Sequence, residues 1–161
     1  MGYYVTGFIV ARECSRQVLE AHSSLKAVPL EQGVDLFPLT QEIVDSIVTA
    51  NQLEPLPEFQ YLNKSLSAFL AKISVLCPVL YFETEYFGGV GAQTAMVFGK
   101  GERRFRPEDT HTDDGKGDLS PISEALQALG VKKQPHHFDG FDCVGLGRYR
   151  DHEDWLSSIP Q

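Results

Sequence analysis

Two glutamates stand two positions apart in the segment 81–91, YFETEYFGGVG. The run 79–86 is rich in aromatic and β-branched residues, so we expect a strand there. Side chains alternate between the two faces of a strand, so Glu83 and Glu85 should share one face while Leu80, Phe82 and Tyr86 share the other and join the core.

A pair of carboxylates on one face has three interpretations. The two groups can act as an acid/base pair or bind a divalent cation. They can also lie on a solvated or ion-paired sheet face, or contribute to a binding surface. Nothing in their spacing fixes a catalytic distance, because no partner residue stands at a defined offset from them.

Glycines follow the strand at 88–91, GGVG, and a second β-rich run occupies 93–98. The dinucleotide fingerprint requires GxGxxG between a strand and a helix, and a Walker loop ends in GKS or GKT. Neither pattern is present. A β-hairpin whose loop needs positive φ accounts for these glycines.

Histidines and cysteines give no local catalytic or metal motif. His136 and His137 stand near Asp139 and Asp142, but adjacent histidines point in opposite directions in an extended chain, and no HExxH or HxH spacing occurs. No GxSxG elbow is present either, and Cys143 lies in an apolar run typical of a packed thiol. We therefore expect neither a metal nor a cofactor, and we assign no catalytic residue.

The C-terminal run 141–155, FDCVGLGRYRDHEDW, combines acidic and aromatic residues. As structure, it predicts a strand on which Arg148 and Arg150 pair with Glu83 or Glu85, with Trp155 closing the core. As function, it predicts an acidic rim suited to a basic partner, because aromatic anchors contribute binding energy while charges steer association. The rim carboxylates are Asp139, Asp142, Asp151, Glu153 and Asp154.

Length and charge restrict the class of protein. The 161 residues suffice for one domain with a sizeable core. With 22 acidic and 14 basic residues the formal net charge is −8, which repels nucleic acid and anionic membranes and favours a basic protein partner. Three widely spaced cysteines, without a CxxC pair, argue against a disulfide framework and for a cytoplasmic protein. No apolar run approaches the length of a membrane span.

The remaining pattern predicts the elements that position these residues. Strands are expected at 3–10 and 25–30, the latter placed at a sheet edge by its proline. Helices are expected from Cys14 to about His22, at 41–50 after an N-cap at Thr40, and at 62–73.

After the hairpin, a loop is expected over 99–118, then a helix with Ser120 as N-cap and Pro121 as first residue. Gly130 should end that helix in a Schellman motif with Val131, and a strand should lie within 138–149. Asp151 should cap a last helical turn. The fold is thus predicted as a single α+β domain over 1–161, a largely antiparallel sheet with a central hairpin and three to five helices packed on it.

Three segments carry a resemblance to a group of small bacterial proteins without an assigned activity. They are PVLYFETEYFGGVGAQTAMVF, PISEALQALGV and FDCVGLGRYRDHEDW, and they cover roughly the C-terminal half. The resemblance implies a single α+β domain without an established cofactor. In size, charge and lack of a catalytic motif, such proteins resemble immunity proteins, which neutralise a toxin delivered between competing bacteria.

The sequence therefore predicts an immunity-type protein that binds a cognate toxin with a basic surface and occludes its active site. The contact residues would be Glu83, Glu85, Asp139, Asp142, Asp151, Glu153 and Asp154 as charges, with Tyr86, Phe87 and Tyr149 as anchors. The alternative is a small hydrolase-like enzyme that uses Glu83, Glu85 and a histidine such as His137. A third possibility is an oligomerisation module, and the sequence leaves the oligomeric state open.

Overall fold

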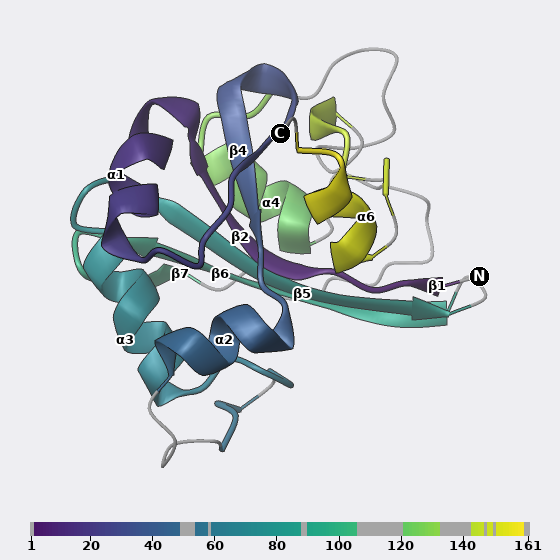
Figure 1. Ribbon diagram of the computed structural model, residues 1–161, viewed down its shortest axis with the longest axis horizontal. Coiled ribbons are helices and arrows are strands. Elements are labelled where there is room, and N and C mark those ends of the chain that lie inside the picture. Colours follow the sequence, from purple (N-terminus) through teal and green to yellow (C-terminus); the bar gives the residue numbers. More distant parts are fainter. Residues whose placement is uncertain are drawn as a thin grey trace.

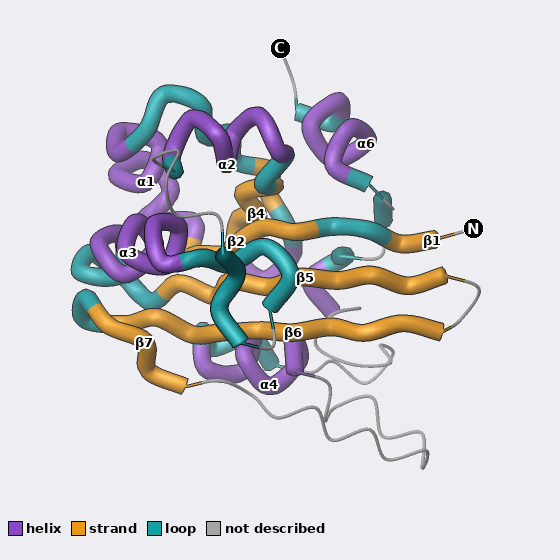
Figure 2. The backbone as a smooth tube through the Cα atoms, turned by 90° about the horizontal axis from the view of Figure 1, so that it is seen from below, coloured by secondary structure: helices purple, strands orange, loops and turns teal. Residues whose placement is uncertain are grey.

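An antiparallel sheet runs through the centre of the molecule (Figure 1). The computed structural model describes residues 2–48, 54–57, 59–87, 90–105, 121–132, 143–146, 148–149 and 151–159. The strands are β1 (Gly2–Tyr3), β2 (Thr6–Ala11), β3 (Val28–Pro29), β4 (Val34–Pro38), β5 (Val79–Phe87), β6 (Val90–Gly99) and β7 (Glu102–Phe105). Their order is β3-β4-β2-β5-β6-β7, and β1 extends the line of β2 along β5 (Figure 2).

Helices cover both faces of this sheet. Two short 3-10 turns, η1 (Arg12–Cys14) and η2 (Glu31–Gly33), precede α1 and β4. The α-helices are α1 (Ser15–Ala21), α2 (Gln41–Ile47), α3 (Lys64–Ile73), α4 (Pro121–Ala128) and α6 (His152–Ser157). Figure 1 shows α2 and α3 on one side of the sheet and α4 and α6 on the other, and α1 packs into the same core as α2 and α3. The α+β prediction is confirmed.

Alternation along the strands explains why there are two cores. Phe8 and Tyr81 face α1, α2 and α3, whereas Ile9, Leu80 and Phe82 face α4 and α6. A sheet covered on both faces has almost continuously apolar strands, since every position is buried. The prediction that Leu80 and Phe82 join the core is therefore confirmed, and the opposite face, which carries Glu83, is also covered.

Several helix termini follow the predicted chemistry. The Thr40 hydroxyl accepts a hydrogen bond from Ile43 N, and the Asp151 carboxylate accepts one from Asp154 N. Gly130 has φ +90°, and the hydrogen bonds Val131 N to Leu126 O and Gly130 N to Gln127 O complete a Schellman motif. These local signals are reliable because the cap side chain and the N–H that it binds are only a few residues apart.

Other elements differ from the prediction. No strand was predicted at β4, and β7 lies inside the loop predicted over 99–118. The strand expected within 138–149 is wrong where the structure describes it, because 143–144 are helical and 145–146 form a turn. The positions 138–142, 147 and 150 lie outside the described residues, as does the predicted N-cap Ser120.

Candidate functional site

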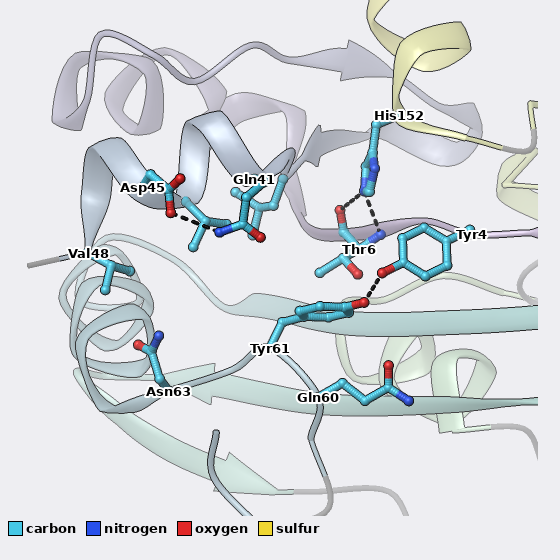
Figure 3. A pocket seen from close by; sticks show the side chains of 11 residues that line it. Tyr4, Thr6, Gln41, Asp45, Val48, Gln60, Tyr61, Asn63 and His152 are labelled. Atoms are coloured by element: carbon cyan, nitrogen blue, oxygen red, sulfur yellow. Dashed lines mark hydrogen bonds between the residues drawn. The ribbon is translucent and has the colours of Figure 1, made fainter. Parts of the chain in front are cut away.

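A pocket of about 600 Å³ opens where α2, the start of β2, the segment 60–63 and α6 come together (Figure 3). Pockets of roughly 300–1,000 Å³ are typical of ligand and anchor-residue sites. The lining combines aromatic and aliphatic side chains with uncharged polar ones, and apolar atoms make up the larger part of its surface. The described lining residues are Tyr4, Thr6, Leu39, Gln41, Val44, Asp45, Val48, Gln60, Tyr61, Asn63 and His152.

One wall of the pocket is held in place by a buried carboxylate. Glu83 is 6% exposed, and its side-chain oxygens accept hydrogen bonds from the backbone N–H groups of Gln60 (2.7 Å), Tyr61 (3.0 Å) and Leu62 (2.8 Å). The Tyr81 hydroxyl donates a further bond at 2.7 Å. Burial, and then the Glu83 charge, raise the pKa of Tyr81 well above its usual value, so the phenol keeps the proton that it donates.

This arrangement corrects two predictions about Glu83. Its oxygens are occupied by the segment 60–62, so they neither supply surface charge to a partner nor form an acid/base pair with Glu85. Glu85 is exposed, and neither glutamate is among the described residues that line the pocket. The carboxylates share a strand face as predicted, but the chain covers one and leaves the other in solvent.

Two tyrosines and a histidine form an aromatic corner of the pocket. The Tyr4 and Tyr61 hydroxyls contact each other, and their rings meet edge to face with centroids 6.2 Å apart. Tyr4 makes a second edge-to-face contact with His152 at 6.1 Å. Tyr4 and Tyr61 are 38% and 37% exposed, so part of each ring remains open to a ligand.

His152 is fixed by the backbone of Thr6. Its Nε2 lies 2.9 Å from Thr6 N and 3.0 Å from Thr6 O, so it accepts from one group or donates to the other according to the tautomer. Burial lowers the pKa of His152, against the opposing influence of the Thr6 hydrogen bond and the Asp151 charge. At neutral pH the imidazole is therefore uncharged.

The Thr6 side chain is a polar group without a partner. Thr6 is 4% exposed, and within the described part of the chain its Oγ1 makes no hydrogen bond. Figure 3 shows the side chain on the pocket floor, between His152 and Tyr61 in that view. Buried hydroxyls usually find a partner, so this atom is the feature of the pocket most in need of one.

The charges around the pocket are negative. Asp45 is the acidic residue of the described lining, where its Oδ1 accepts from Gln41 Nε2 at 2.8 Å, and none of those lining residues is Lys or Arg. The register on either side of Tyr4 places it opposite Glu85 in β5. Burial, followed by the Glu85 charge, raises the pKa of Tyr61, as expected beside an anionic neighbour.

The predicted acidic rim is described only at its C-terminal end. Asp151, Glu153 and Asp154 are exposed on α6 beside the pocket residue His152, and Asp151 also caps that helix. Tyr149 is half-buried, with its ring edge to face against Trp155 at 4.9 Å. Asp139 and Asp142 lie outside the described residues, as do the side chains of Tyr86 and Phe87, and so does His137.

The predicted arginine pairing with the glutamates is wrong at Arg148. This residue follows a turn rather than a strand, and its guanidinium pairs with Glu31 at 3.4 Å. Arg150 lies outside the described residues. Trp155, a residue of α6, is fully buried in the core between the sheet and the helices α4 and α6, which confirms the prediction that it closes the core.

The cysteines are packed, as predicted. Cys14, Cys77 and Cys143 are buried and free of disulfides. Burial, together with a hydrogen bond to Cys14, raises the pKa of Cys77 to about 12, so this thiol is a poor nucleophile at neutral pH. Among the described residues there is no cluster of metal-ligating side chains, and no helix there has the length and apolar character to cross a bilayer.

The pocket could not be recognised from the sequence, because its residues come from four distant segments. Tyr4, Thr6, Tyr61 and His152 have no common spacing, and the pocket residue Asp45 belongs to an ordinary amphipathic helix. One available signal was Glu83 itself, since a carboxylate within a strand as apolar as 79–82 requires hydrogen-bond donors from elsewhere in the chain.

Comparison with known proteins adds no relative. No protein-family model, no curated protein and no solved structure matches the chain.

Proposed function

We propose that this protein is an immunity-type inhibitor, acting in the cytoplasm, that binds the basic surface of a cognate bacterial toxin and occludes its active site. The observation that carries the proposal is the negative potential of the pocket region: Asp45 lines it, Glu85 flanks it, and the described lining contains no cation. Such a surface attracts a positively charged partner and repels phosphate-rich ones.

The adjacent α6 extends this negative surface. Glu153 and Asp154 are exposed in its first turn, and Asp151 precedes them. A rim of exposed carboxylates around a partly open aromatic pocket matches the general arrangement of protein interfaces, in which a buried anchor provides affinity and peripheral charges speed association. The partly exposed rings of Tyr4 and Tyr61 are suited to contact such an anchor.

The hydrolase alternative loses the residues on which it depended. Glu83 is saturated by donors from the chain, and Glu85 is exposed beside the pocket without being one of its described lining residues. The geometry therefore gives no support to a catalytic pair at these positions.

A co-expression experiment tests the proposal. The reading frame adjacent to this gene is expressed in a bacterial host with and without the chain. We expect its product to arrest growth alone and to be neutralised by co-expression, with the two purified proteins forming a stable complex. An adjacent product that is harmless, or that remains toxic in the presence of this chain, would overturn the proposal.

A charge-matched pair of variants tests the electrostatic part. Neutralising Glu85, Glu153 and Asp154 together should lower the association rate constant about tenfold at low salt and reduce its salt dependence. The control removes three exposed carboxylates elsewhere, Glu13, Glu20 and Glu102, and should change the rate little. Equal effects of the two triple variants would show that net charge alone, rather than this surface, governs association.

A further inference from the structure

The Thr6 hydroxyl identifies a binding position within the pocket. It is 4% exposed, has no partner within the described part of the chain, and belongs to a residue of the pocket floor. A buried hydroxyl left unsatisfied is destabilising, and a ligand atom that hydrogen-bonds to it recovers that loss. Because the Thr6 backbone is already bound to His152 and Leu39, only the side chain is left to contact a ligand.

The charges of the residues in and beside the pocket determine whether it favours a cation or an anion. The Asp45 carboxylate lies on the α2 wall, and Glu85 stands opposite Tyr4 in the sheet. His152 is uncharged at neutral pH, because burial lowers its pKa, so it does not offset these charges. With no Lys or Arg in the described lining, the pocket favours a cation.

The shape of the lining selects the kind of cation. Tyr4 and Tyr61 are each more than a third exposed, and cations are attracted to the faces of aromatic rings. A guanidinium is planar, stacks on such rings and carries five N–H donors, whereas an ammonium is compact and strongly hydrated. Carboxylate, hydroxyl and phenol oxygens are all acceptors for these donors.

We propose that the pocket is a receptor for an arginine side chain of the protein partner, with the guanidinium against Tyr4 and Tyr61 and within reach of the Asp45 carboxylate and the Thr6 hydroxyl. This inference rests on the proposed function, since it names the part of the basic partner that the site receives. The volume of about 600 Å³ accommodates the arginine together with the backbone that carries it.

A titration with small probes tests the pocket without the partner. N-acetyl-L-arginine methylamide is added to the ¹⁵N-labelled protein and followed by NMR. We expect saturable shifts at the amides of Thr6, Tyr61 and Asp45, with a dissociation constant of about 1 mM. The citrulline analogue, equal in shape but uncharged, should bind at least about tenfold more weakly, and the lysine analogue should fall between them.

Two variants assign the contacts. Thr6→Val removes the unpartnered hydroxyl and keeps the shape of the side chain. The free energy of unfolding should therefore stay the same or increase, while the affinity for the arginine probe falls about fivefold. Asp45→Asn should weaken binding of the arginine probe about tenfold, and Glu20→Gln, at an exposed carboxylate of α1 outside the described lining, serves as its charge-matched control. A purely structural Thr6 would leave probe affinity unchanged on substitution to valine, which would overturn the assignment of its hydroxyl.

The outcomes separate this inference from the proposed function. If the citrulline probe binds as well as arginine, or the shifts fall outside the pocket, the arginine site is refuted even when the adjacent gene product is neutralised. If the arginine probe binds in the pocket but no neutralisation occurs, the proposed function fails while the guanidinium site stands.

Discussion

Two buried carboxylates on the same side of the sheet, Asp35 in β4 and Glu83 in β5, are stabilised in different ways. Each residue is 6% exposed. Asp35 pairs with a cation, accepting from Arg12 Nε at 2.8 Å, and with the Ser15 hydroxyl at 2.6 Å. Glu83 accepts only from backbone N–H groups and a phenol, and no Lys or Arg in the described part of the chain pairs with it.

The two carboxylates therefore differ in charge balance: Asp35 is neutralised by a cation, whereas Glu83 is held, within the described residues, by neutral donors only. The Arg12 guanidinium neutralises Asp35 and also reaches the carbonyls of Leu30 and Val34, so this region fastens the start of β4 to the end of β2. Glu83 fastens the segment that presents Tyr61, but it does so without a cation, and its charge adds to those of Glu85 and Asp45 near the pocket. A buried charge can thus build a site wall and keep the site electronegative.

The largest expected effect is that of Glu83→Ala. The change leaves three backbone N–H groups and a phenol without their acceptor, and an unsatisfied buried donor costs about 1–3 kcal/mol. We expect a loss of about 3–5 kcal/mol in the free energy of unfolding, measured by urea denaturation. A loss below about 1 kcal/mol would mean that the segment 60–62 does not depend on this carboxylate.

Asp35→Ala should lower the free energy of unfolding by less than Glu83→Ala does, by about 2 kcal/mol, although the two carboxylates are equally buried. Its partner Arg12 has a side chain that is 48% exposed, so the guanidinium can turn to water once the carboxylate is removed. Three of the donors to Glu83 are backbone N–H groups and the fourth is the phenol of the fully buried Tyr81, so none of them can turn to water in this way. Urea denaturation of the two alanine variants under the same conditions makes the comparison, and a larger loss for Asp35 would reverse the ranking.

Tyr81→Phe removes one donor of the set and leaves the rest of the Glu83 anchor in place. Because the hydroxyl donates to a charged group, we expect a loss of about 1.5 kcal/mol. In the double variant with Glu83→Ala the phenol has no acceptor to lose, so the two losses should not add. Additive losses, measured in a double-mutant cycle by urea denaturation, would show that the phenol and the carboxylate act separately.

The local part of this architecture was predictable from sequence, and the non-local part was not. The caps at Thr40 and Asp151 and the end of α4 at Gly130 depend on a few neighbouring residues. The hairpin of β5 and β6 was equally clear. By contrast, β4 reads VDLFP, which contains a charge and a proline, and its strand conformation is established by pairing with β2.

The candidate site depends even more on non-local contacts, so still less of it could be predicted from the sequence. Glu83 and Glu85 are identical in type and share a strand face, so no local pattern says that one is covered and the other exposed. The segment 60–62 decides the matter, and it lies where the connection meets the start of the helix expected at 62–73, whose pattern gives no sign of a contact with Glu83. His152 likewise meets Thr6 from 146 residues away, at a contact that no spacing predicts.

The smallest expected effect concerns His152 and the pH dependence of stability. Burial lowers its pKa in the folded protein below the ordinary value of about 6.5, so the unfolded chain binds this proton more readily. Between the folded pKa and about 6.5 the unfolded state therefore holds more protons, and the free energy of unfolding decreases as the pH falls through that window.

His152→Gln isolates this contribution, because glutamine does not titrate and its amide can still bond to the Thr6 backbone. Both proteins are denatured with urea at several pH values from 7.5 to about 4.5. The free energy of unfolding should decrease more steeply with falling pH for the wild type. Since the other titrating groups are common to both proteins, the difference between the two curves belongs to His152. Parallel curves would mean that the imidazole is protonated as easily in the folded pocket as in the unfolded chain, which would contradict the lowered pKa.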